Sequence, residues 1–246
     1  MQLLNNDDNW AKLVDPKTPL SRGKFAVIYF SHQATMLYLA VIVILAIASV
    51  MLIESWWQLA GSLALVAAIY PLVEFCLHRF VLHSRRLYRM PWTAPLWRRI
   101  HYAHHMNPND LSVLFGAPYT TIPAVLVPTL PIGYLAFGLP GAVSAACGGF
   151  VALIIYEFFH CAAHLPVKFN SAIMQYMRRH HLLHHFHAET GNFGIVTNIV
   201  DRVIGTEYES ARDVGASATV KNLGYDDEET RKYPWVAALD KAPDRR

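Results

Sequence analysis

Long uncharged segments dominate the first part of this chain. No Asp, Glu, Lys or Arg occurs in the 29 residues of Phe25–Ile53, in the 19 residues of Ser55–Val73 or in the 46 residues of Leu111–Tyr156. A helix that crosses a bilayer needs about 20 mainly apolar residues. The first two segments therefore predict one membrane span each. The third is long enough for two spans, with a break near Gly138–Gly141.

The pattern predicts an all-α membrane protein with four transmembrane helices. We place the spans at about residues 34–53, 57–77, 121–137 and 141–160. The alternative, a soluble protein with buried helices, is disfavoured because 246 residues leave too little chain to cover these segments. We expect residues 1–206 to form the membrane domain. Residues 207–246, which are rich in charged side chains, are expected to form a polar cytosolic tail.

The distribution of basic residues predicts the orientation in the membrane. Lys and Arg are concentrated before the first span, in the loop after the second span and in the C-terminal part, whereas residues 54–56 and 138–141 contain none. Because cytoplasmic loops carry an excess of Lys and Arg, both termini and the large polar loop are expected to face the cytoplasm. The membrane would be the inner membrane of a bacterium or the endoplasmic reticulum of a eukaryote.

Composition excludes several classes of protein. Apolar residues make up 54% of the chain and charged residues only 16%, whereas about a quarter is usual in soluble domains. This composition, with a net charge of only +3, argues against disorder and nucleic-acid binding. Cys76, Cys147 and Cys161 lie in apolar stretches without CxxC spacing, so a disulfide framework or a thiolate zinc site is not expected.

Histidine is the residue type that carries candidate chemistry. Twelve of the thirteen histidines lie in four short windows, residues 78–83, 101–105, 160–164 and 180–187, and half of the positions there are histidine. Each window lies at or just beyond the end of a predicted span on the same side. All four windows can therefore converge at the cytoplasmic membrane boundary.

The spacing inside the windows places the histidines on shared helix faces. His101, His104 and His105 follow an i, i+3, i+4 pattern, as do His181, His184 and His185, while His160 and His164 are four apart. Residues at these spacings are neighbours on a helix surface. His78 and His83 are five apart, which is more typical of a helix end or a distorted turn.

Ten converging imidazoles indicate metal binding. Neutral imidazole binds Zn, Cu, Fe and Ni, and one zinc ion takes three or four protein ligands. Ten histidines therefore predict two metal ions with about five ligands each. An all-imidazole set adds no negative charge, which favours a metal that changes oxidation state, and we expect iron. Carboxylates that could orient the ligands are Glu74, Glu157 and Asp201, although Glu74 and Glu157 could instead be exposed at span ends.

The four motifs resemble the fatty acid hydroxylase superfamily of membrane di-metal oxygenases. They are HRFVLH (His78–His83), HYAHH (His101–His105), HCAAH (His160–His164) and HLLHH (His181–His185). EFCLHRFVLH and FGIVTNIVDRVIGT (Phe193–Thr206) are most similar to fatty acid 2-hydroxylases of sphingolipid metabolism. The resemblance covers about Leu72 to Thr206, and those enzymes usually have Asp at the position of Glu157.

The resemblance implies four transmembrane helices under a cytosolic cap that holds two iron ions. The ligands carried over by motif are His78, His83, His101, His104, His105, His160, His164, His181, His184 and His185, with His180 and His187 as accessory groups. The implied reaction is O2-dependent hydroxylation of a lipid acyl chain, at C2. Zinc could occupy the site in purified protein. Because the fused cytochrome b5 domain of many family members is missing here, two electrons are expected from a separate ferredoxin- or cytochrome b5-type protein.

Several alternatives remain open from the sequence. A desaturase shares the first hydrogen abstraction, and the superfamily also acts on sterols and carotenoids. A metal transporter would require ionisable residues near the bilayer midplane, and the predicted spans contain none. Arg85, Arg86, Arg98 and Arg99 could contact a lipid head group or serve only as determinants of orientation.

Overall fold

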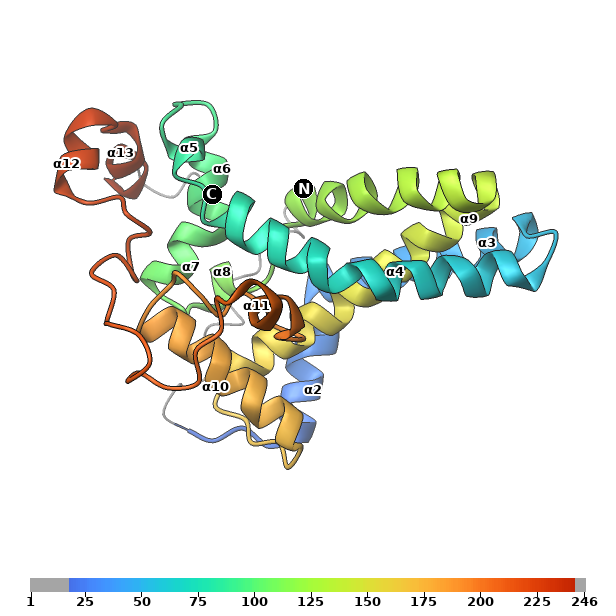
Figure 1. Ribbon diagram of the computed structural model, residues 1–246, viewed down its shortest axis with the longest axis horizontal. Coiled ribbons are helices and arrows are strands. Elements are labelled where there is room, and N and C mark those ends of the chain that lie inside the picture. Colours follow the sequence, from blue (N-terminus) through green and yellow to red (C-terminus); the bar gives the residue numbers. More distant parts are fainter. Residues whose placement is uncertain (1–17, 242–246) are drawn as a thin grey trace.

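The computed structural model describes residues 18–241. The secondary structure of these residues is entirely helical, apart from one isolated β-bridge between Leu20 and Val167. Figure 1 shows the long helices extending together to one side and a broader end built mainly from shorter helices. The elements are α2 (Arg22–Ser31), α3 (Gln33–Leu52), α4 (Trp56–Cys76), the π-helix η2 (Leu77–Leu82), α5 (Arg85–Tyr88), α6 (Ala94–Trp97), the π-helix η3 (Arg98–Tyr102), α7 (Ala103–Met106), α8 (Leu111–Leu114), α9 (Pro118–His164), α10 (Ala172–Phe186), α11 (Ile199–Ile204), α12 (Asp227–Lys232) and α13 (Trp235–Lys241).

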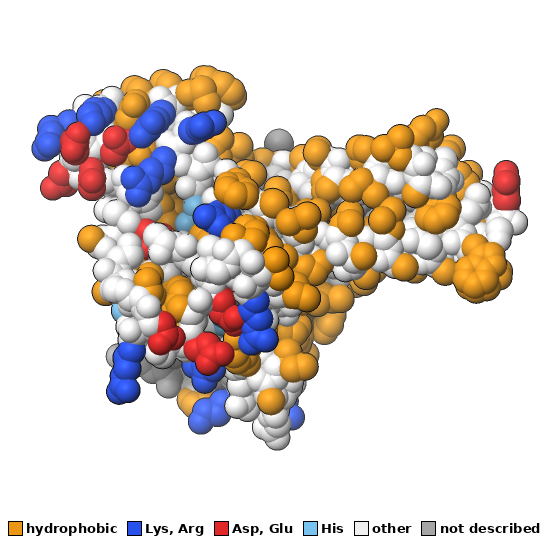
Figure 2. All heavy atoms as spheres, viewed as in Figure 1, with side chains coloured by type: hydrophobic (Ala, Val, Ile, Leu, Met, Phe, Trp, Pro, Cys, Tyr) orange, Lys and Arg blue, Asp and Glu red, His pale blue; other side chains and the backbone are white. Residues whose placement is uncertain are grey.

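Three helical segments are long and apolar enough to cross a membrane: Gln33–Leu52, Trp56–Tyr88 and Ser112–His164. Their outer surfaces expose large apolar side chains, for example Ile44 and Leu135. Figure 2 shows that hydrophobic side chains cover the extended helices, while most charged side chains gather over the broad end. Such a continuous apolar surface is typical of a membrane protein. The prediction of an all-helical membrane protein is confirmed at this level.

The long helix α9 is a helical hairpin rather than a straight rod. Backbone angles leave the helical region at Phe137 and Gly138, and Gly138 has a φ of 66°, a conformation that glycine adopts without steric cost. The chain reverses there, so that its two arms lie side by side (Figure 1). A Cβ atom at Gly133 or at Gly141 would overlap the backbone of the other glycine. The break therefore occurs where the sequence predicted it.

The extended helices pack through a mixture of aromatic and very small residues. Tyr38, Val125 and Phe150 belong to one buried cluster that joins α3 to both arms of α9. Gly148 lies against Val66 of α4, and its lack of a side chain lets the two helices approach closely. Small residues are the usual means of close helix packing in membranes. This packing sets the distance between α4 and α9, whose ends carry histidines.

The C-terminal segment, for which the sequence predicts a polar tail, packs against the broad end as far as the structure describes it. Tyr225 and Val236 are buried in one cluster with Tyr88 and Trp97 of α5 and α6. The indole Nε1 of Trp235 donates to the carbonyl of Tyr88 at 2.7 Å. These aromatic residues are isolated among charged ones in the sequence, so hydropathy alone does not reveal their burial.

We predict that Gly141→Val destabilises the hairpin. The new side chain would overlap the backbone of Gly133 and the Cβ of Phe137, and overpacking of this kind costs about 1–3 kcal/mol. Thermal unfolding of the purified protein in detergent should show a lower midpoint. Leu135→Val, at a position that is 84% exposed, is the matched control. An unchanged midpoint for Gly141→Val would show that the two arms do not meet as described.

Candidate metal centre

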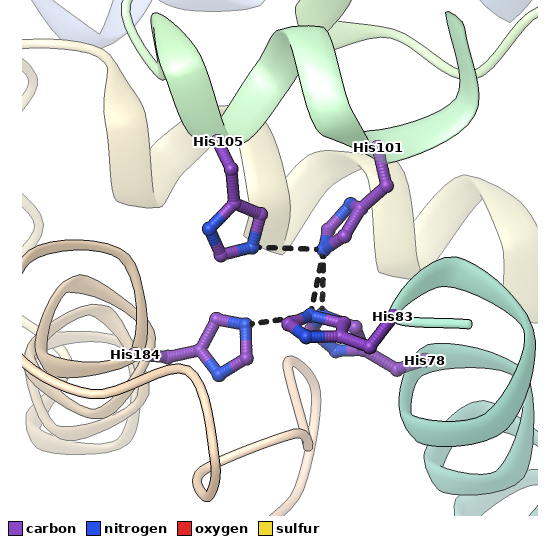
Figure 3. A group of neighbouring side chains, drawn as sticks. All are labelled: His78, His83, His101, His105 and His184. Atoms are coloured by element: carbon purple, nitrogen blue, oxygen red, sulfur yellow. Dashed lines mark hydrogen bonds between the residues drawn. The ribbon is translucent and has the colours of Figure 1, made fainter. Parts of the chain in front are cut away.

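Ten histidines meet in two groups of five at the junction between the long helices and the broad end. Within each group, one nitrogen from every histidine lies within 4.8 Å of the others. Group A consists of His78, His83, His101, His105 and His184 (Figure 3), and group B consists of His104, His160, His164, His181 and His185. These are the same ten histidines that the sequence motifs single out.

The division between the groups is compatible with helix geometry. Histidines four residues apart belong to the same group: His101 and His105 lie in group A, whereas His160 and His164 lie in group B. The third histidine of the window at residues 101–105, His104, faces group B. Three residues fall just short of a full helical turn and four go just past it, so His104 and His105 lie on opposite sides of His101 around the helix axis. One helical segment can therefore contribute ligands to both groups.

A π-helix explains the spacing of five residues between His78 and His83. The amide nitrogen of His83 donates to the carbonyl of His78 at 3.2 Å, which is the i to i+5 bond of a π-turn. This wider turn places both rings on the same side, with their centroids 5.0 Å apart. The distorted turn that the sequence predicted here is confirmed.

The Nε2 atoms of group A converge on one point. The Nε2 of His101 lies 3.1 Å from that of His78 and 3.0 Å from those of His83 and His105 (Figure 3). One imidazole nitrogen carries at most one proton, so it cannot donate to three neighbours at once. Two nitrogens bound at right angles to a metal at 2.0–2.1 Å would be about 3 Å apart. The geometry therefore fits a bound cation better than a hydrogen-bond network.

The Nε2 atoms of group B also lie close to one another. The Nε2 atoms of His160 and His104 are 2.9 Å apart, as are those of His164 and His181. The ring of His185 lies 4.6 Å from that of His104 between their centroids. All five histidines of the group are buried. This donor set also fits a metal ion held by imidazoles alone.

Burial keeps these histidines neutral. Loss of hydration is the largest cause that lowers the pKa of five of these ligand candidates, and neighbouring imidazoles add to it: His101, His104, His181, His184 and His185. The pKa of His105 falls to about 3 for the same first reason. A neutral imidazole offers a lone pair to a metal, whereas a protonated one cannot. The site is therefore in a metal-binding protonation state at neutral pH.

Backbone carbonyls orient three rings of group A. The Nδ1 of His78 donates to the carbonyl of Phe193 at 2.5 Å, and the Nδ1 of His184 donates to that of Gly191 at 2.7 Å. The Nδ1 of His105 donates to the carbonyl of Val220 at 2.8 Å. Each bond places the proton on Nδ1, so Nε2 faces its group with a lone pair.

Glu74 and Asp201, two of the predicted orienting carboxylates, act through the loop at residues 191–196. Oε1 of Glu74 accepts from the amides of Ile195 and Val196, at 2.5 and 2.9 Å. Asp201 accepts from the amides of Phe193 and Gly194, at 3.1 and 2.7 Å. Both carboxylates therefore fix the loop whose carbonyls orient His78 and His184.

The remaining predicted residues lie outside both groups. Oε1 of Glu157 accepts from the amide of Gly116 at 2.9 Å. His180 Nε2 lies 3.8 Å from Asp201, and His187 Nε2 donates to the carbonyl of Val214 at 2.7 Å. Sequence reasoning missed the orienting carbonyls because any residue type can supply one. The two glycines within this loop, Gly191 and Gly194, were its only visible signal.

A largely apolar cavity of about 450 Å³ runs between α4 and both arms of α9 and ends at the histidines. Its walls are helical stripes that repeat every three or four residues: Val66, Ile69 and Val73 on α4 followed by Leu77 at the start of η2, and Gly149, Leu153 and Tyr156 on the second arm of α9. His78, His101, His104 and His160 line the histidine end, together with Tyr70, Glu74 and Glu157. The cavity therefore joins the membrane-facing helices to both groups.

Comparisons with known proteins agree with this site. A sequence model of the fatty acid hydroxylase family matches residues 63–206. The chain is 30% identical to the fatty acid 2-hydroxylase of Rattus norvegicus over 143 residues, which are 57% of this chain and 38% of the rat protein. It is 27% identical to the dihydroceramide fatty acyl 2-hydroxylase of Arabidopsis thaliana over 151 residues, 61% of each chain. The chain thus spans well under half the length of the rat protein.

The fold also has a counterpart among solved structures. A structure of full-length Scs7p, in which only the hydroxylase domain is visible, superposes with a TM-score of 0.63. The two chains are 22% identical, and the match covers 78% of this chain and 69% of the other. At this level of identity the likeness establishes the fold.

We predict that Asp201→Asn loosens the loop at residues 191–196. The substitution replaces one of the two oxygens that accept from Phe193 and Gly194 with an amide donor, and an unsatisfied buried group costs about 1–3 kcal/mol. Hydrogen exchange should accelerate at the amides of both residues. The matched control is Asp213→Asn, since Asp213 also accepts from two amides but is exposed. Unchanged exchange in the loop would contradict the assigned role.

Proposed function

The chain belongs to the fatty acid hydroxylase family, and on this basis we propose that it is a membrane-bound di-metal oxygenase that hydroxylates the acyl chain of a lipid at C2. The supporting observation is the position of the two histidine groups at the end of an apolar cavity between membrane-facing helices. The overall reaction consumes O2, two electrons and two protons. One oxygen atom enters a C–H bond, and the other leaves as water.

We propose iron as the metal in both groups. Group A would hold one ion through His78, His83, His101, His105 and His184, and group B would hold the second through His104, His160, His164, His181 and His185. Two iron ions would supply O2 activation and the oxidation of an unactivated C–H bond. Uncharged donor sets made only of imidazole nitrogens bind iron and also zinc. The metal content must therefore be measured on protein that has been loaded with Fe(II) in the absence of oxygen.

The residues of the cavity determine how a lipid would bind. Apolar stripes on α4 and α9 would take the hydrocarbon chain and exclude water from the histidine end. Tyr70, Glu74 and Glu157 add polar side chains to the walls near that end, where they can contact the polar part of the lipid. A chain bound in this direction has the carbons nearest its polar group beside the histidines. This orientation supports hydroxylation at C2.

We propose four membrane crossings: α3, α4 and the two arms of α9. The bend at Gly138 and the contact between Gly133 and Gly141 support two crossings within α9. The histidine groups would then lie on the cytoplasmic side as part of a cap. The concentration of Lys and Arg in segments beside the histidine motifs supports this orientation, in the inner membrane of a bacterium or the endoplasmic reticulum of a eukaryote.

We further propose that a separate ferredoxin- or cytochrome b5-type protein supplies the electrons. In the described part of the chain, the two histidine groups are the only clusters that could hold a metal ion, and both adjoin the cavity. The described residues thus contain no third metal cluster to relay electrons from solvent. Electrons would have to arrive from another protein or from another segment of a longer chain.

We predict that the two groups bind metal separately. After anaerobic loading with Fe(II), His101→Ala and His164→Ala should each retain about one ion in place of two, because each substitution removes a donor from one group. Metal content per chain, measured by plasma mass spectrometry, is the readout. His187→Gln is the control, since His187 belongs to neither group. Two ions in both alanine variants would contradict the assignment of ligands.

We predict a hydroxylated lipid as the product. Lipids from cells that make the protein should contain a species one oxygen heavier, which disappears with His184→Ala, and its fragments should place the oxygen at C2. A species two hydrogens lighter would indicate a desaturase instead. The acyl-lipid hypothesis would be wrong if iron-loaded protein with a competent electron donor changes no acyl lipid.

A further inference from the structure

The far end of the cavity lies deep among the long helices. Along η2 and α4 the cavity extends from His78 back to Val66, twelve residues or about 18 Å of helix. Along the second arm of α9 it extends from His160 back to Gly149, eleven residues or about 16 Å. The cavity is therefore elongated parallel to these helices, as a hydrocarbon chain would require.

Three residues from three helical segments close this far end. Val66 comes from α4, Thr129 from the first arm of α9 and Gly149 from the second arm, and all three line the cavity. Val66 is only 4% exposed and Thr129 only 5%. A Cβ atom on Gly149 would lie 2.8 Å from the methyl group of Thr129. The helical segments are thus in close contact here, and no residue farther along them from the histidines lines the cavity.

The surface presented by these residues is apolar. The hydroxyl of Thr129 donates to the carbonyl of Val125 at 2.7 Å. The proton of this hydroxyl is therefore used in a hydrogen bond within its own helix. The methyl group of Thr129 faces Gly149. This end suits the methyl terminus of an acyl chain, whereas the histidine end suits the polar part of the lipid.

We propose that Val66, Thr129 and Gly149 limit the length of the acyl chain that this protein hydroxylates. The proposal rests on the proposed function, because it requires that the cavity binds an acyl chain with its polar end at the histidines. With the polar end fixed there, a chain longer than the cavity must either bend or leave methylene groups outside. Each methylene group that loses its burial weakens binding about fourfold.

The test is the chain-length preference of Val66 variants. Val66→Phe fills the far end of the cavity and should favour chains two carbons shorter, by roughly tenfold relative to the original best chain. Val66→Ala enlarges the same end and should shift the preference toward longer chains. Membranes containing each variant would be given an equimolar mixture of acyl lipids that differ in steps of two carbons. Ratios of hydroxylated products cancel differences in protein amount.

Leu72→Phe is the matched control, because Leu72 lies on the same helix, is 54% exposed and does not line the cavity. It should leave the product ratios unchanged. Opposite shifts for Val66→Phe and Val66→Ala would support the proposal, and unchanged ratios in both active variants would overturn it. If Val66→Phe is inactive on every chain, Val66→Ala decides alone. Failure of the unmodified protein to hydroxylate any chain would instead reject the proposed function.

Discussion

The structure depends on one electrostatic constraint, the convergence of ten neutral imidazoles into two small volumes. Burial removes the option of protonation, and the Nε2 atom of His101 alone has three other Nε2 atoms within 3.1 Å. Lone pairs directed at one another repel unless a cation lies between them. The segments that carry the histidines must therefore be kept in place against this repulsion, either by packing and hydrogen bonds elsewhere in the fold or by a bound metal.

The long helices provide part of that support. Contacts between α4 and α9, including the close approach at Gly148, fix the distance between the ends that carry His78 and His160. Short segments complete the arrangement: a π-turn widens η2 so that two histidines face one group, and a loop held by buried carboxylates offers carbonyls to two rings. The same helices form the cavity walls, so a bound lipid and the histidines share one framework.

Much of this arrangement is predictable from the sequence, because the spacing of residues along a helix determines which side chains lie on the same face. The ten histidines, the break near Gly138 and the distorted turn before His83 follow from spacing and hydropathy. Spacing does not predict that His104 faces a different group from His101, because that depends on where the partner helices lie. The packing of Trp235 on Tyr88 was also unpredicted, since isolated aromatic residues among charges produce no periodic signal.

The two groups differ in what orients their rings. Three rings of group A donate from Nδ1 to backbone carbonyls, and one of these carbonyls, that of Val220, lies beyond the residues that the family model matches. Among the described residues, four Nδ1 atoms of group B are buried without a hydrogen-bond partner, those of His104, His164, His181 and His185. No hydrogen bond from Nδ1 orients those four rings. A metal bound in group B would therefore contribute more to the order of the rings than one bound in group A, although the two donor sets are chemically the same.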